Sequence, residues 1–128
     1  MKNEKQILII EPDRLAGLDL QLQLEKKGHF VLRPISLVDT AVLISKFMPD
    51  LIIADTNIKK QNLFEQLKKY LRKYKLPFIW IGTKEKKESE GINVLGTFSK
   101  PLDSNKIVAL IVNYFNKKIN PLFHRKNV

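Results

Sequence analysis

Several charged and hydroxyl side chains stand within three residues of the ends of short, mainly apolar runs of this 128-residue chain. They are Glu11 and Asp13, Asp55, Thr83 beside Gly82, and Lys100, which follow the runs at 7–10, 51–54, 78–81 and 94–98. Crowded carboxylates repel each other, and the usual remedies are a hard cation with oxygen ligands or a nearby ammonium group. Such a set is suited to a phosphoryl group, because one carboxylate can attack phosphorus while cations neutralise the phosphoryl oxygens. A single acid after a strand is more often a turn or cap residue than a catalytic one. The prediction of a phosphoryl site therefore depends on the whole set of residues.

Parallel strands would bring these residues to one place. The apolar runs are typical of strands covered on both faces, and a further short strand is expected at 30–32. Helical spacing of apolar residues predicts helices from about 13 to 27, 36 to 48, 62 to 74 and 104 to 116. Strands that alternate with helices form a parallel sheet with helices on both faces, and ligands bind at the carboxyl ends of its strands.

Three local features complete this prediction. In the first helix the apolar stripe is Leu15, Leu18 and Leu22, although Gly17 weakens the helix. In the third helix we expect Leu63, Leu67, Leu71 and Tyr74 to face inward. Residues 84–90 contain no apolar side chain, so we expect a loop or a short solvated turn there.

The composition narrows the class of protein. The chain has no cysteine, which excludes disulfides and thiolate metal sites and fits a reducing compartment. The first apolar run is too short for a signal peptide or a membrane span, so we expect a soluble cytoplasmic protein without membrane partners. The net charge of +10 favours acidic partners in a non-specific way.

Four segments, in order and at the expected spacing, resemble receiver domains of two-component response regulators. They are ILIIEPD at 7–13, PDLIIAD at 49–55, LPFIWIGT at 76–83 and FSKPLD at 98–103. The resemblance extends over residues 6–118. It implies a flavodoxin-like (CheY-like) three-layer α/β/α fold with a five-stranded parallel sheet of order 2-1-3-4-5. The polar segment at 84–90 implies that the family's fourth helix is short or missing.

The resemblance also implies a role for each candidate residue. Asp55 would accept a phosphoryl group from a histidine kinase or phosphotransfer protein, Lys100 would contact that group, and Pro101 is the proline that follows this lysine. Magnesium would be held by Glu11, Asp13, Asp55 and the backbone carbonyl of Asn57.

Three positions depart from the family pattern. Pro12 stands where the family has a second acid, Gly82 where it has the switch hydroxyl, and Thr97 where it has the switch aromatic residue. Asp13 is a candidate replacement for the missing carboxylate, and Thr83 for the missing hydroxyl. We therefore expect Mg²⁺ binding to be weak or absent.

From these observations we predict a receiver domain at 1–118 with a polar basic tail at 119–128. It would be a stand-alone or excised response-regulator domain in phosphorelay signalling, and not an enzyme. It would be a phosphoprotein that acts by contact with a downstream protein target.

Two other functions remain open. The alternative is a pseudo-receiver, which is a phosphorylation-independent protein-interaction module. A third interpretation is a nucleic-acid-binding module, because the third helix carries Lys68, Lys69, Arg72 and Lys73. A solvated helix face explains these charges better, so we expect no specific nucleic-acid binding.

Overall fold

A single parallel sheet forms the middle of the molecule in the computed structural model, which describes residues 4–34, 38–55, 61–82 and 89–119. Its strands are β1 (Gln6–Ile10), β2 (Phe30–Leu32), β3 (Leu51–Asp55), β4 (Pro77–Ile81) and β5 (Asn93–Phe98). The order across the sheet is β2-β1-β3-β4-β5, and every pair is parallel. This confirms the strand order that the family resemblance implied.

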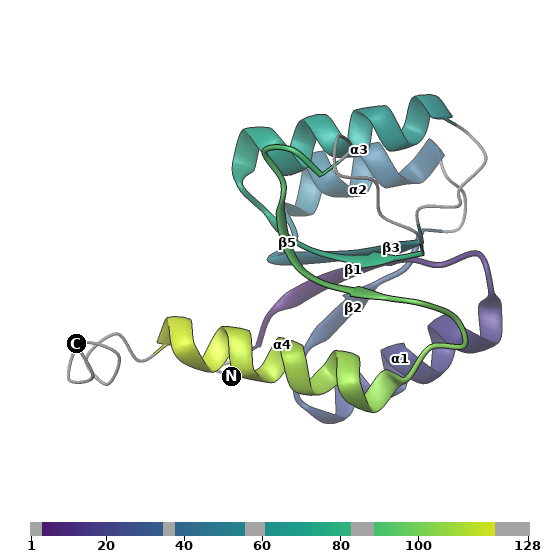
Figure 1. Cartoon of the computed structure of the whole chain (residues 1–128), viewed down its shortest axis with the longest axis vertical. Coiled ribbons are helices and arrows are strands. Elements are labelled where there is room, and N and C mark those ends of the chain that lie inside the picture. The colour runs from purple at the N-terminus through teal and green to yellow at the C-terminus, as the bar shows by residue number, and fades with distance from the viewer. Residues whose placement is uncertain (1–3, 35–37, 56–60, 83–88, 120–128) are drawn as a thin grey trace.

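Helices cover both faces of this sheet. They are α1 (Arg14–Lys26), α2 (Val38–Phe47), α3 (Gln61–Tyr74) and α4 (Ser104–Ile119). Figure 1 shows α1 and α4 below the sheet and α2 and α3 above it, which gives the predicted three layers. None of the helices in the described part of the chain is long and apolar enough to cross a membrane.

The alternation of side chains along the strands divides the core into two halves. Ile7, Ile9 and Ile53 pack toward α1 and α4, whereas Leu8 and Trp80 pack on the opposite face toward α2 and α3. All five residues of β3 are buried, as expected for a central parallel strand. This rigid strand fixes the backbone position of the acid at its end.

The buried face of α1 differs from the sequence prediction. Leu20 and Leu24 are fully buried, while the predicted stripe of Leu15, Leu18 and Leu22 is 79%, 44% and 49% exposed. The buried positions continue to Gly17, which has no side chain. Because a glycine does not count as an apolar position, the true stripe of Gly17, Leu20 and Leu24 looked shorter in the sequence than the exposed one.

The inner face of α3 is confirmed at two positions and wrong at a third. Leu67 and Leu71 are buried, but Tyr74 is 40% exposed. The Tyr74 ring stacks on that of Tyr70, with 6.2 Å between the ring centroids. A tyrosine at the end of a helix can cover apolar surface with its ring while its hydroxyl stays in water. The side chain of Leu63 lies outside the described residues.

The connection between β4 and β5 can be described only in part. Residues 83–88 lie outside the described residues, and residues 89–91 form a turn. No helix occurs in the described part of this connection.

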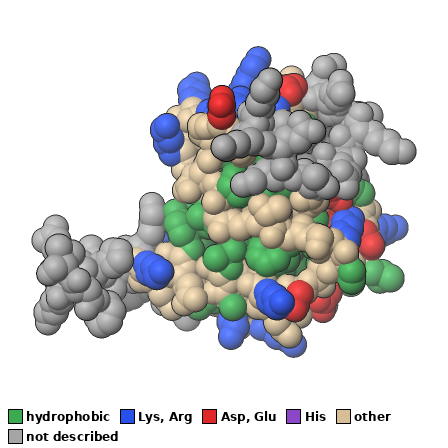
Figure 2. All heavy atoms as spheres, in the orientation of Figure 1, with side chains coloured by type: hydrophobic (Ala, Val, Ile, Leu, Met, Phe, Trp, Pro, Cys, Tyr) green, Lys and Arg blue, Asp and Glu red, His purple; other side chains and the backbone are tan. Residues whose placement is uncertain are grey.

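Figure 2 shows hydrophobic side chains at the surface along β5 and α4, with lysine and arginine side chains around them.

Candidate functional site

Glu11, Asp55 and Lys100 converge at the carboxyl ends of β1, β3 and β5. Lys100 Nζ lies 3.0 Å from Glu11 Oε2 and 2.8 Å from Asp55 Oδ2. The register explains how the acids meet: Ile10 pairs with Ala54, so the residues that follow them end two neighbouring strands. The lysine reaches the same point from the segment that follows the edge strand, 89 residues further along the chain than Glu11.

The two acids are buried and the lysine is not. The side chain of Glu11 is 0% exposed and that of Asp55 is 4% exposed, whereas that of Lys100 is 42% exposed. The hydrogen bond to Asp55 raises the pKa of Lys100 above its usual value, and the bond to Glu11 adds to this against the opposing effect of desolvation. The ammonium group therefore stays charged and neutralises part of the charge of the acids.

Asp13 begins α1. Its Oδ1 accepts hydrogen bonds from the backbone N–H groups of Leu15 and Ala16, at 3.1 and 3.2 Å. These bonds satisfy donors that the first turn of a helix leaves unpaired. The backbone N–H of Asp13 donates to Glu11 Oε2 at 2.9 Å, so the residue also fixes the neighbouring acid. In this arrangement the Asp13 carboxylate is the N-cap of α1, and its role as a metal ligand stays a prediction.

The donor set for a divalent cation is small. Glu11 Oε1 is buried and has no hydrogen-bond partner, which leaves one carboxylate oxygen available to a cation. Pro12 offers no side-chain ligand, and no group of three or more metal-binding acids, histidines or cysteines occurs among the described residues. Asn57 and Thr83 lie outside the described residues. The carboxylates of Glu11 and Asp55 are suitable oxygen ligands for a hard cation, but these two residues alone fill only part of its coordination shell.

The two altered switch positions have different surroundings. Gly82 follows β4 with a φ of 115°, a conformation that residues with a side chain rarely adopt, and its N–H donates to the carbonyl of Phe98 at 2.9 Å. Thr97 is exposed, while the next residue, Phe98, packs into the core beside α1 and α4. The one-residue offset thus places the aromatic ring on the opposite face from Thr97.

Arg33, which is not among the predicted site residues, also contacts the loop that carries Glu11. Its Nη2 donates to the carbonyl of Glu11 at 3.4 Å, and its Nη1 donates to the carbonyl of Arg14 at 3.5 Å. The signal in the sequence was Gly17, a residue that is unfavourable inside a helix.

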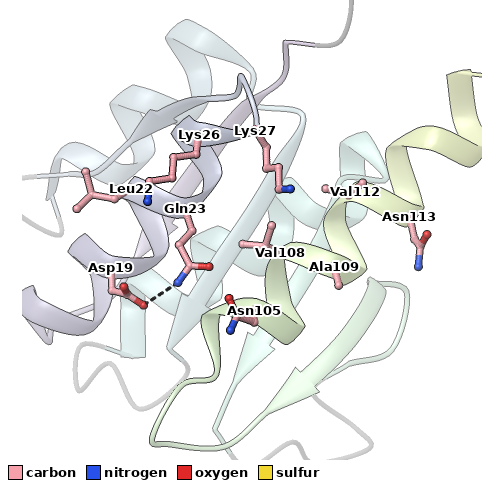
Figure 3. A pocket seen from close by; sticks show the side chains of 10 residues that line it. All are labelled: Asp19, Leu22, Gln23, Lys26, Lys27, Asn105, Val108, Ala109, Val112 and Asn113. Carbon is pink, nitrogen blue, oxygen red and sulfur yellow. Dashed lines mark hydrogen bonds between the residues drawn. The ribbon is translucent and has the colours of Figure 1, made fainter.

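A groove of about 810 Å³ lies between α1 and α4. Figure 3 shows Lys26 from the end of α1 and the next residue, Lys27, beside its apolar side chains, which are Leu22, Val108, Ala109 and Val112. None of the three converging residues lines it. The groove is therefore a separate feature of the surface.

The basic side chains of α3 are partly used within the domain. Lys68 is buried, lies 2.8 Å from Glu65 Oε1 and stands over the ring of Phe64. The Nε of Arg72 donates to the carbonyl of Glu90 at 2.8 Å. These contacts favour a structural role for two of the four cations over a row of phosphate contacts.

The strand order and the helix layers are those of response regulator receiver domains. The chain is similar to a CheY-like receiver domain protein from Methanospirillum hungatei JF-1, with a TM-score of 0.75, 17% identity, and coverage of 91% of this chain and 98% of that one. It is equally similar to the receiver domain of the TMAO respiratory system response regulator TorR (TM-score 0.75, 17% identity, 88% and 98% covered). The N-terminal domain of the nisin resistance regulator NsrR is 23% identical, with a TM-score of 0.70 and coverage of 87% and 97%.

These likenesses confirm the receiver-domain resemblance at the level of the fold. No model of a known protein family matches the sequence, and no curated protein is significantly similar to it. What the site does must therefore be argued from its own residues.

Proposed function

We propose that this domain is a phosphoacceptor in two-component signalling, and that Asp55 receives the phosphoryl group. The observation that carries the proposal is the bridge from Lys100 to the two buried acids at the carboxyl ends of the strands. A buried carboxylate beside an ammonium group is arranged to form a covalent bond to phosphorus and to stabilise the charge that the phosphoryl group brings.

The chemistry follows from the positions of these groups. A carboxylate oxygen of Asp55 attacks the phosphorus of a phosphohistidine, the P–N bond breaks, and an acyl phosphate forms while the released imidazole takes up a proton. Lys100, whose side chain is partly exposed, moves its ion pair from the carboxylate to a phosphoryl oxygen. Glu11 and Asp55 would hold Mg²⁺, which when bound neutralises phosphoryl oxygens.

The partners follow from this role. A histidine kinase or a phosphotransfer protein supplies the phosphoryl group, and a downstream protein recognises the modified domain. Such a domain works in the cytoplasm as a signalling module and not as an enzyme. The receiver fold supports this general class of partner.

A pseudo-receiver is the second candidate, and two features of the site favour it. Lys100 already forms an ion pair with both acids, and Pro12 occupies the place of a further carboxylate. A domain of this kind would bind its partner through its surface and would not respond to phosphate.

One experiment separates the two candidates. The domain is incubated with acetyl phosphate and a saturating concentration of Mg²⁺, and its intact mass is measured. We expect one added phosphoryl group in the wild type and none in Asp55→Asn. If the wild type gains no mass even at high donor and magnesium concentrations, the phosphoacceptor proposal is wrong and the pseudo-receiver remains.

A further inference from the structure

Gly17 lies inside α1, where a glycine destabilises a helix relative to alanine. Its backbone does not have a positive φ, unlike those of Gly28, Gly82 and Gly91. The conformational freedom of glycine is therefore not the reason for its presence. The reason must be the space that a side chain would fill.

That space is occupied by Arg33. A Cβ atom at Gly17 would overlap Nη2 of Arg33 and lie 2.5 Å from its Cζ, which is closer than such atoms approach in proteins. The distance of 3.1 Å to Nε would also be a tight contact. The guanidinium group therefore rests on the surface of α1 where a side chain is missing. In this position it donates hydrogen bonds to the carbonyls of Glu11 and Arg14.

The contact joins three parts of the fold. Arg33 directly follows β2, Glu11 directly follows β1, and Arg14 is the first residue of α1. The hydrogen bonds to the two carbonyls are long. The position of the guanidinium group therefore depends on its packing against the backbone of α1 at Gly17 as much as on these bonds. The loop at 11–14 is thus held from the side of β2, while Asp13 holds the Glu11 carboxylate from within the loop.

We propose that Arg33 is a positioning residue of the candidate phosphorylation site, and that Gly17 is present to admit its guanidinium group. Arg33 fixes the loop at 11–14, and through it the buried carboxylate of Glu11 that Lys100 bridges to Asp55. This inference rests on the proposed function in one respect only, namely that the positioned site is the one that accepts the phosphoryl group.

The test uses four proteins: the wild type, Gly17→Ala, Arg33→Met and the double variant. Gly17→Ala is the more informative single variant, because alanine stabilises a helix relative to glycine by about fivefold in the folding equilibrium. Unfolding therefore cannot explain a lower rate of phosphorylation in this variant. The guanidinium group is the end of a flexible side chain, and the new Cβ displaces it at little cost. Arg72→Met is the matched control, since Arg72 also donates to a backbone carbonyl but does so far from the loop at 11–14.

Two measurements are made on each protein. The first is the amide signal of Asp13 in a ¹⁵N–¹H spectrum, which reports the hydrogen bond to Glu11 Oε2 and does not require phosphorylation. The second is the rate of phosphorylation by acetyl phosphate. We expect the two single variants and the double variant to shift the Asp13 signal alike and to slow phosphorylation by about tenfold, a typical cost of losing a supporting contact. Arg33→Lys should behave like Arg33→Met, because lysine cannot donate to both carbonyls from one planar group.

The proposal is overturned if Arg33→Met leaves the Asp13 signal and the rate unchanged. It is also overturned if Gly17→Ala has the same effect with Arg33 absent as with Arg33 present, or if Arg33→Lys behaves as the wild type. If the wild type is not phosphorylated at all, the proposed function fails, and the Asp13 signal still decides the positioning role of Arg33.

Discussion

Replacing Lys100 by methionine would leave two buried carboxylates side by side without a cation. The oxygens of Glu11 and Asp55 that contact Nζ lie no farther apart than the sum of the two distances, 5.8 Å. Two negative charges at this separation repel each other by about 3 kcal/mol at an effective permittivity of about 20. In the wild type the ammonium group of Lys100 offsets this repulsion, and its removal leaves the buried charges uncompensated. We therefore expect Lys100→Met to lower the free energy of unfolding at neutral pH by about 3 kcal/mol.

Urea unfolding at two pH values measures this effect. At a pH below the ordinary range of carboxyl groups the negative charges are absent from both proteins, so the variant and the wild type should approach the same stability. The double variant Glu11→Gln, Lys100→Met should recover most of the loss at neutral pH, because only one charge remains buried. Lys106→Met, at an exposed position of α4, is the control and should change little. A loss that persists in the double variant would refute the repulsion argument.

Three further predictions concern the metal, the core and pH. Pro12→Asp should tighten Mg²⁺ binding in a calorimetric titration, and unchanged affinity would mean that the missing carboxylate is not the defect. Leu20→Ala should cost about 2–5 kcal/mol in urea unfolding, whereas Leu18→Gln should cost less than about 0.5 kcal/mol, and equal costs would contradict the buried face of α1. Burial, and next the charge of Lys5, lower the pKa of His29 below 6.5, so the unfolded state binds this proton more readily. The free energy of unfolding should therefore fall as the pH drops through 6.5, and a His29→Gln variant should lose that dependence.

The strands were predictable because burial on two faces leaves a clear signal. The run at 51–54 has no polar side chain, and the acid after it ends β3 in the structure as well. The faces of the helices were less predictable. In α1 the leucines at every second position offer two stripes, and only the packing of Leu20 and Leu24 against the sheet decides between them.

The meeting of Glu11, Asp55 and Lys100 followed from strand order, which a family resemblance can supply. The contacts around them did not. Whether Asp13 turns its carboxylate to a cation or to the helix depends on the local geometry of one loop, and a sequence offers both possibilities. The role of Arg33 could not be predicted for a different reason. The side chain that explains the glycine at position 17 lies 16 residues further along the chain, after β2.

The charges of the site connect the loss at Pro12 with the proposed function. Glu11, Asp55 and Lys100 together carry one net negative charge, so a divalent cation is attracted less strongly than it would be by a site with a further acid. If Asp55 is phosphorylated as we propose, its single charge is replaced by the charge of close to two on a phosphoryl group. The same three residues and the phosphoryl group then carry about two net negative charges, which one Mg²⁺ ion balances. Magnesium should therefore bind more tightly to the phosphorylated domain than to the unmodified one, and by linkage it should shift the phosphorylation equilibrium toward the phosphorylated form.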